Sequence, residues 1–118
     1  MVKYNKKGGI MEEVVLYLNE ENFDEVIKKN EKVVVDFWAS WCMPCRMVAP
    51  IFENLAKKYK DQIIFAKVNV DENPDIASRF KIFSIPNFII FKNGEKVGEI
   101  VGAMPEKTLE EKILSFLK

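Results

Sequence analysis

Apolar residues in this chain occur both in short continuous runs and at helical spacing. The continuous runs lie at 14–18, 33–38, 63–70 and 87–92. They are rich in β-branched and aromatic residues, which is typical of strands covered on both faces. Asn93-Gly94 follows the last run and favours a tight hairpin into an antiparallel strand over 96–101. The pattern therefore predicts five strands, of which the last two form a hairpin.

The segments between these runs have the spacing of helices. Asn22, with Glu25 three residues later, predicts an N-cap and capping box for a first helix. A longer helix is predicted from one apolar stripe, which comprises Met47, Val48, Ile51, Phe52, Leu55, Ala56 and Tyr59. Asn73-Pro74 indicates a short helix that reaches Phe80. Pro105 begins a last helix, with its buried face formed by Leu109, Ile113, Phe116 and Leu117.

The resulting order is β-α-β-α-β-α-β-β-α, which predicts an α/β fold. A βαβ beginning followed by a hairpin and a helix indicates a mixed central sheet with helices on both faces. The chain has 118 residues, the length of one ordinary domain. Gly8-Gly9 interrupts local order near the start. We therefore expect a flexible N-terminal extension over 1–12 and a single domain over 13–118.

Charge and hydropathy indicate no nucleic acid or membrane as a partner. The 18 basic residues balance the 18 acidic ones, so no net charge attracts a polyanion. No apolar run approaches the roughly 20 residues that a membrane helix needs. The first residues contain no apolar core of a signal peptide, so we expect a cytoplasmic location.

The cysteines carry the candidate chemistry. The chain has no histidine, which excludes Ser/His, Cys/His and His-ligated metal schemes within one subunit. Its two cysteines form one C-x-x-C, Cys42 and Cys45. Zinc needs about four ligands and would require a second subunit. Haem attachment needs a histidine where Arg46 stands. A redox dithiol and a structural disulfide remain, and we expect no metal.

The position of the pair favours the redox dithiol. Cys42 lies between a buried strand and a long helix, where free N–H groups and the helix dipole stabilise a thiolate. Cys42 is expected to be exposed, whereas Cys45, one turn inside the helix, is expected to be buried. Pro44 fits the first helical turn and stiffens the short ring. A structural disulfide with so short a loop would restrict the unfolded chain little.

The stretch Trp38-Ala39-Ser40-Trp41-Cys42-Met43-Pro44-Cys45-Arg46 resembles the thioredoxin family. The resemblance extends over roughly residues 14–117 and includes further matches in the expected order. These are Val35-Asp36-Phe37-Trp38, Met47-Val48-Ala49-Pro50, Lys67-Val68-Asn69-Val70-Asp71, Ser84-Ile85-Pro86, Phe91-Lys92-Asn93-Gly94 and Val101-Gly102-Ala103.

The resemblance implies a thioredoxin-like three-layer fold and a protein-disulfide reductase that maintains redox homeostasis. Cys42 would attack a client disulfide, and Cys45 would then release the reduced client and leave the redox-active disulfide Cys42–Cys45. No other cofactor is implied for this chain. The implied partners are disulfide-containing client proteins and a thioredoxin reductase that supplies electrons. We expect a monomer.

The resemblance also assigns supporting residues. Asp36 would lie buried behind the second cysteine and assist its proton transfer, with Lys67 on the next strand near it. Pro86 would follow a cis peptide bond and face the cysteines. The backbone of Ile85 would pair with an extended client segment.

The apolar groove around Cys42 would be completed by Trp41, Gly102 and Ala103. Two positions depart from the family pattern: Met43 where glycine is usual, and Asn87 where threonine is usual. Residues at Met43 and Pro44 tune the redox potential. Met43 therefore leaves a disulfide oxidase or isomerase of the same fold as an alternative. Two further alternatives are a glutaredoxin and a thioredoxin-fold binding module whose cysteines are incidental.

Overall fold

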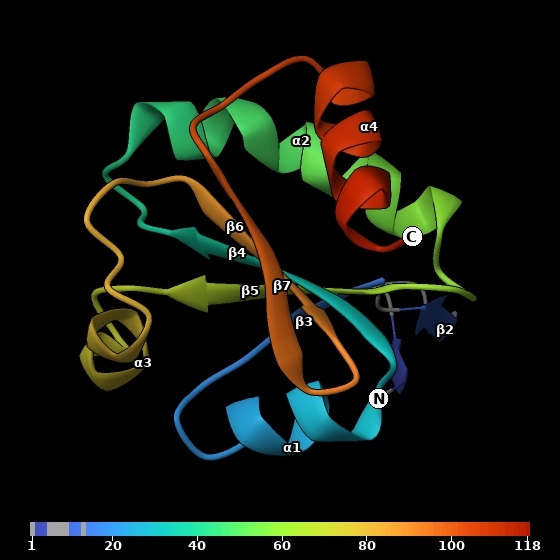
Figure 1. Cartoon of the computed structure of the whole chain (residues 1–118), viewed down its shortest axis with the longest axis horizontal. Helices are drawn as coiled ribbons and strands as arrows, with labels where there is room; N and C mark the ends of the chain where they lie inside the picture. Colours follow the sequence, from blue (N-terminus) through green and yellow to red (C-terminus); the bar gives the residue numbers. More distant parts are fainter. Residues whose placement is uncertain (1, 5–9, 13) are drawn as a thin grey trace.

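A five-stranded sheet forms the centre of the molecule (Figure 1). The computed structural model describes residues 2–4, 10–12 and 14–118. In spatial order the strands are β3 (Val15–Tyr17), β5 (Ile64–Asn69), β4 (Lys32–Trp38), β6 (Asn87–Lys92) and β7 (Glu95–Val101). β5 pairs parallel with β3 and β4, whereas β6 pairs antiparallel with β4 and β7. The predicted mixed sheet is confirmed.

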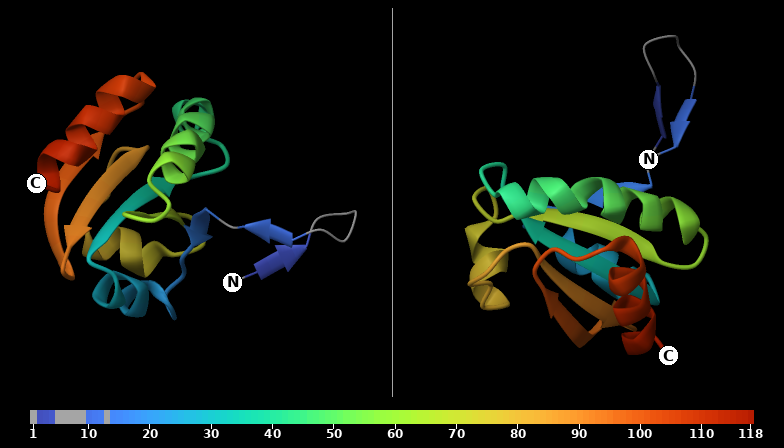
Figure 2. Two further views of the ribbon diagram at one scale, coloured as in Figure 1. Left: turned by 90° about the vertical axis from the view of Figure 1, so that its right-hand side faces the viewer. Right: turned by 90° about the horizontal axis from the view of Figure 1, so that it is seen from above.

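Two pairs of helices cover the two faces of this sheet. One face carries α1 (Phe23–Lys29) and α3 (Pro74–Arg79), and the other carries α2 (Met43–Lys58) and α4 (Glu106–Phe116), as Figure 2 shows. Each parallel connection buries a helix against the sheet, since a crossover must return over one face. The result is the three-layer α/β fold expected from the sequence.

The central strand β4 separates two hydrophobic clusters by the alternation of its side chains. Val33, Val35 and Phe37 pack in the cluster beneath α1 and α3. Val34 packs in the other cluster, beneath α2 and α4. Asp36 therefore points toward the α2 face, although its neighbours in sequence are core residues. The strand pattern thus places a carboxyl group inside the α2 layer.

Aromatic contacts fix α2 on the sheet. The ring of Phe52 in α2 lies 5.1 Å from that of Phe65 in β5 and 5.7 Å from that of Phe88 in β6, measured between centroids. All three side chains are almost fully buried. Such pairs contribute beyond simple burial, so the position of α2 over β5 and β6 is well defined.

The hairpin between β6 and β7 turns at Asn93 and Gly94. Both residues have positive φ, 53° and 84°. A two-residue turn of this kind matches the twist of the flanking strands, and asparagine followed by glycine is its most favourable sequence. The turn brings β7 beside β6 and leads the chain back toward the start of α2.

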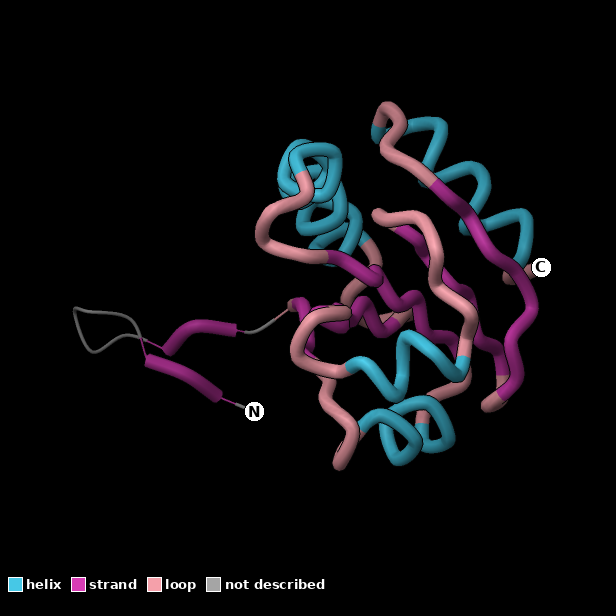
Figure 3. The backbone as a smooth tube through the Cα atoms, turned by 90° about the vertical axis from the view of Figure 1, so that its left-hand side faces the viewer, coloured by secondary structure: helices cyan, strands magenta, loops and turns pink. Residues whose placement is uncertain are grey.

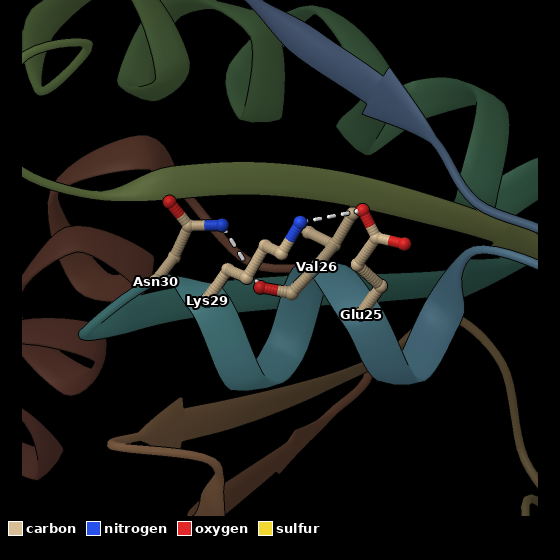
Figure 4. A network of polar contacts seen from close by, with 4 residues as sticks. All are labelled: Glu25, Val26, Lys29 and Asn30. Carbon is tan, nitrogen blue, oxygen red and sulfur yellow. Dashed lines mark hydrogen bonds and ion pairs between the residues drawn. The ribbon is translucent and has the colours of Figure 1, made fainter.

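The capping box predicted for α1 is wrong. Asn22 stands at the N-cap but makes no side-chain cap hydrogen bond; its Oδ1 instead accepts the backbone N–H of Asn19. Glu25 pairs with Lys29 one turn later, at 2.9 Å between Oε1 and Nζ (Figure 4). Asn30 ends the helix by donating from Nδ2 to the carbonyl of Val26 at 2.9 Å. A competing loop bond and an ion pair thus take both predicted capping groups.

Two residues predicted to be buried are exposed. Met47 in α2 is 68% exposed, since the buried stripe of this helix comprises Cys45, Val48, Phe52, Leu55 and Ala56, and Met47 lies beside it. Phe116 is 38% exposed because it ends α4 and lies over Gly98 of the outer strand β7. The last helix begins at Glu106, with Pro105 as its N-cap.

Near the N-terminus, β1 (Val2–Tyr4) pairs antiparallel with β2 (Ile10–Glu12). This ribbon is separate from the five-stranded sheet, as Figure 3 shows. The sequence did not predict the pairing, and Gly8-Gly9 lies outside the described residues. The division into an extension over 1–12 and a domain over 13–118 stays a prediction.

Candidate active site

The two cysteines occupy the start of α2. Cys42 is the N-cap residue, and Cys45 lies in the first turn with its Cα 5.3 Å from that of Cys42. The two side chains form a disulfide. The backbone N–H of Cys45 donates to Sγ of Cys42 at 3.2 Å. An N–H directed at this sulfur, together with the helix dipole, would stabilise a negative charge on Cys42 in the reduced protein.

Exposure does not distinguish the cysteines. Cys42 is 4% exposed and Cys45 is 2% exposed, so the prediction of an exposed Cys42 is wrong. Both pack with Ala39, and the half-buried Trp38 and Ile85 cover them. The asymmetry of the pair arises from backbone position, because Cys45 provides the N–H and Cys42 the sulfur that accepts it.

A second loop faces the cysteines. The carbonyl oxygen of Ile85 lies 3.8 Å from Sγ of Cys42. In the disulfide this sulfur has no proton to donate, so the contact is one of proximity. The peptide bond between Ile85 and Pro86 is cis, as the resemblance implied. Gly102, with φ 98°, donates its N–H to the carbonyl of Pro86 at 2.8 Å. The structure therefore brings the cysteine loop, the proline loop and the end of β7 together.

Asp36 is fully buried and has no hydrogen-bond partner for either carboxyl oxygen. Burial raises the pKa of this carboxyl from 3.8 to about 7, and the positive charge of Lys67 opposes the rise. Lys67 is its register partner on β5 and is 7% exposed. A carboxyl with a pKa near 7 can both accept and donate a proton at neutral pH.

Trp38 connects this carboxyl region to the cysteines. It lies two residues after Asp36 on the same face of β4. Nζ of Lys67 lies 4.6 Å from the Trp38 ring, in cation–π geometry. Trp38 also packs against the cluster that contains Cys42 and Cys45. The site thus continues inward from the disulfide, past the Trp38 ring, to the buried side chains of Asp36 and Lys67.

Trp41 and Ala103 lie at the outer edge of the site. Trp41 is 69% exposed, and its Nε1 donates to Oδ2 of Asp71 at 2.8 Å. Ala103 is exposed and lines a hollow against α2. Asp71 was missed as a site residue, although it ends the motif that begins at Lys67. Its signal was a carboxylate two residues after β5, the strand that runs beside β4.

The two positions that depart from the family pattern lie in different surroundings. Met43 is 59% exposed and begins α2, whereas Asn87 is 2% exposed and begins β6. Nδ2 of Asn87 donates to Oε2 of Glu99 at 2.9 Å. Pro44 occupies the first helical turn, where its missing N–H leaves nothing unpaired.

Another exposed aromatic residue escaped prediction. Phe83, two residues before Ile85, is 90% exposed. It belongs to no helical or strand pattern, so apolar periodicity gave no signal for it.

Within the described residues no group of three or more histidine, cysteine or acidic side chains could hold a metal ion. Among the helices of the same residues, none has the length and apolar character to cross a membrane.

A pair of cysteines that forms a disulfide on a helix N-terminus, with a protonatable carboxyl deeper in the same layer, defines a thiol–disulfide oxidoreductase. The profile of the Thioredoxin family matches residues 14–115 of the chain. The chain therefore belongs to the thioredoxin family, as the sequence motifs indicated.

Individual relatives agree with this assignment. Thioredoxin of Alicyclobacillus acidocaldarius is 45% identical over 101 residues, which are 86% of this chain and 96% of that protein. Thioredoxin 1 of Synechococcus elongatus is 53% identical over 85 residues, or 72% of this chain and 79% of that protein. The structure of a mutant thioredoxin from Halobacterium salinarum superposes with a TM-score of 0.80 at 36% identity, covering 88% of this chain and 91% of that one.

Family and site together establish the class of reaction. The chain is a protein-disulfide oxidoreductase, and it acts as a reductase through thiol–disulfide exchange. The prediction made from the Cys42–Cys45 pair is confirmed at this level.

Proposed function

We propose that the chain reduces client proteins in two exchanges, with Cys42 as the attacking residue and Cys45 as the resolving residue. The observation that carries this assignment is the N–H of Cys45 directed at Sγ of Cys42, at 3.2 Å on the N-cap of α2. Only one sulfur of the pair receives this stabilisation. It is therefore the sulfur expected to be a thiolate at neutral pH.

The electrons balance over the two steps. The Cys42 thiolate attacks one sulfur of the client disulfide, forms a mixed disulfide and releases the other client sulfur as a thiolate. Cys45 then loses its proton and attacks Sγ of Cys42, which releases the second client sulfur. Two electrons have passed to the client, and Cys42 and Cys45 are left joined as the disulfide seen in the structure.

Asp36 is proposed to take the proton that Cys45 loses. Its pKa of about 7 suits this role, and Trp38, two residues further along the same face of β4, packs against both cysteines. The cis-proline loop is proposed to bind the client, because the backbone of Ile85 lies beside Cys42 and can pair with an extended segment. Trp41, Gly102 and Ala103 would form the walls of this groove.

The proposed partners are disulfide-containing proteins and a thioredoxin reductase that returns two electrons to the disulfide. Met43 and Pro44 are proposed to tune the potential at which this occurs. A cytoplasmic location, a monomeric state and the absence of any cofactor besides the Cys42–Cys45 pair stay predictions from the sequence.

The test replaces each cysteine separately. Cys45→Ser should accumulate mixed disulfides with client proteins, because the first exchange occurs and the second cannot. Cys42→Ser should accumulate none. Asp36→Asn should slow the second exchange by about a hundredfold, which is the lower range of acid–base catalysis, while leaving the first nearly unchanged. Equal trapping by both cysteine variants would contradict the assignment of roles.

The reduction potential tests the direction of electron flow. A value close to that of a typical thioredoxin supports a reductase in the cell. A markedly more oxidising value would instead support the oxidase or isomerase alternative.

A further inference from the structure

An apolar hollow of about 300 Å³ opens beside the exchange site. It lies between α2 and the connection from β7 to α4, which passes the first half of α2 in Figure 1. Its lining consists of apolar residues only, namely Met47, Val48, Ile51, Ala103, Met104 and Pro105. This volume is at the small end of the range for ligand pockets. The hollow therefore suits one apolar side chain.

The rim and floor of the hollow differ in exposure. Val48 on the floor is 1% exposed and belongs to the core beneath α2. Met47 on the rim is 68% exposed, and Met104 opposite is half-buried against the same core. Methionine is unbranched and polarisable, so it adapts to ligands of different shape. A rigid floor between two adaptable side chains suits a variety of apolar groups.

The position along α2 limits which ligand can reach the hollow. Met47 is five residues after Cys42, or about 7–8 Å along the helix axis, and Ile51 is nine residues after it, or about 13–14 Å. An extended chain advances about 3.3 Å per residue. A polypeptide bonded to Cys42 and running beside α2 would reach the hollow with its second to fourth residue.

We infer that the hollow binds an aliphatic or aromatic side chain of the client, two to four residues from the client cysteine. This inference rests on the proposed function, because it requires a client bonded at Cys42. The hollow is continuous with the exchange site, which favours the client over other ligands. Ala103 lines the hollow and directly follows Gly102, which donates its N–H to the carbonyl of Pro86. The hollow would select among client disulfides without taking part in the exchange.

The experiment uses short peptides whose single cysteine is joined to 5-thio-2-nitrobenzoate, with release of the coloured thiol as the signal. Two peptides differ only in leucine or serine three residues from the cysteine. With the reduced full chain, the leucine peptide should react about tenfold faster, which corresponds to ~1.4 kcal/mol. The small disulfide formed by two 5-thio-2-nitrobenzoate units serves as a substrate with no peptide chain.

Three variants locate this preference. Met47→Gln replaces the rim residue by a polar one of similar length and should reduce the preference to less than threefold. Met47→Leu keeps an apolar rim and should retain the preference. Leu114→Gln changes an apolar residue of α4 that is 37% exposed and does not line the hollow, and it should also retain the preference.

Several results would overturn the inference. Equal rates for both peptides with the unaltered chain would do so, and so would an unchanged preference in Met47→Gln. A change in sedimentation of Met47→Gln with an unchanged preference would assign the hollow to a second copy of the chain instead. Failure to reduce even the small disulfide would contradict the proposed exchange itself. Reduction of all substrates at equal rates would leave the exchange intact and contradict only the proposed binding of a client side chain in the hollow.

Discussion

Replacing Asp36 by asparagine should change how the stability of the protein depends on pH. The side chain is fully buried, neither oxygen has a hydrogen-bond partner, and its pKa is raised from 3.8 to about 7. Between these two values the folded protein holds a proton that the unfolded chain has released. The free energy of unfolding must therefore fall as the pH rises through this range, and level off above about pH 7.

The size of the effect follows from the same two values. The rise of about three units in the pKa of Asp36 corresponds to ~4 kcal/mol in the free energy of unfolding, at 1.36 kcal/mol per unit. Between pH 5 and the raised pKa, the unaltered protein should lose ~3 kcal/mol through Asp36 alone. Asp36→Asn keeps the shape of the side chain and cannot ionise. The variant should therefore be the more stable protein at pH 8, and its advantage should shrink toward pH 5.

Urea unfolding of the oxidised proteins at several pH values measures this difference. The disulfide prevents the cysteines from titrating, so their ionisation does not contribute. Asp61→Asn, at an exposed position, controls for the loss of one carboxylate. The difference between Asp36→Asn and the unaltered protein should grow by ~3 kcal/mol from pH 5 to pH 8. Parallel profiles of the two proteins would refute the claim that Asp36 is buried without compensation.

Three further substitutions test the packing and the surface network. Phe52→Ala should lower the free energy of unfolding by ~3–5 kcal/mol, because a fully buried ring is removed between two others; chemical unfolding measures it, and a loss below ~1 kcal/mol would contradict the packing. Gly98→Ala should cost ~1 kcal/mol, since the added Cβ would overlap the ring of Phe116. That loss should disappear in a Phe116→Ala background, and persistence there would reject the clash. Glu110→Gln should reduce the loss of stability at acid pH. The hydrogen bond from Lys58 holds the pKa of Glu110 low, so the stability that Glu110 contributes is present above the ordinary carboxyl pKa and is lost as the pH falls through the lowered pKa. An acid unfolding curve that superposes on that of the unaltered protein would count against it.

The sequence predicted the fold well where local signals and packing agree. The β-branched run at 33–38 is the central strand β4, and the Asn93-Gly94 turn forms with both residues at positive φ. The predictions failed where two local interactions compete for one group. Asn22 is a residue type that commonly caps helices, but its side chain accepts the backbone N–H of Asn19 in the preceding loop. Glu25 forms an ion pair with Lys29. The residue types show which groups can form hydrogen bonds or ion pairs, but they do not show which of several nearby partners each group contacts.

The site was predictable in its chemistry and less so in its geometry. The C-x-x-C, the carboxylate of Asp36 inside an apolar strand and the Ile85-Pro86 pair were visible in the sequence. Contacts between distant segments were not, because nothing local indicates them: the bond from Trp41 to Asp71 joins residues thirty positions apart. The hollow beside α2 could not be predicted for the same reason, since half of its lining comes from the distant β7–α4 connection.

The burial of Cys42 changes what makes the two cysteines unequal. Exposure was expected to single out the attacking residue, yet both are nearly inaccessible. The remaining asymmetry is the N–H of Cys45 at Sγ of Cys42, which depends on the helix beginning at Met43. The Met43 side chain is 59% exposed and uncharged, so it leaves this donor in place. The identity of the attacking residue should therefore be insensitive to residue 43, whereas the potential also depends on how readily the reduced loop opens. A Met43→Gly variant should consequently change the reduction potential and keep Cys42 as the residue trapped by Cys45→Ser.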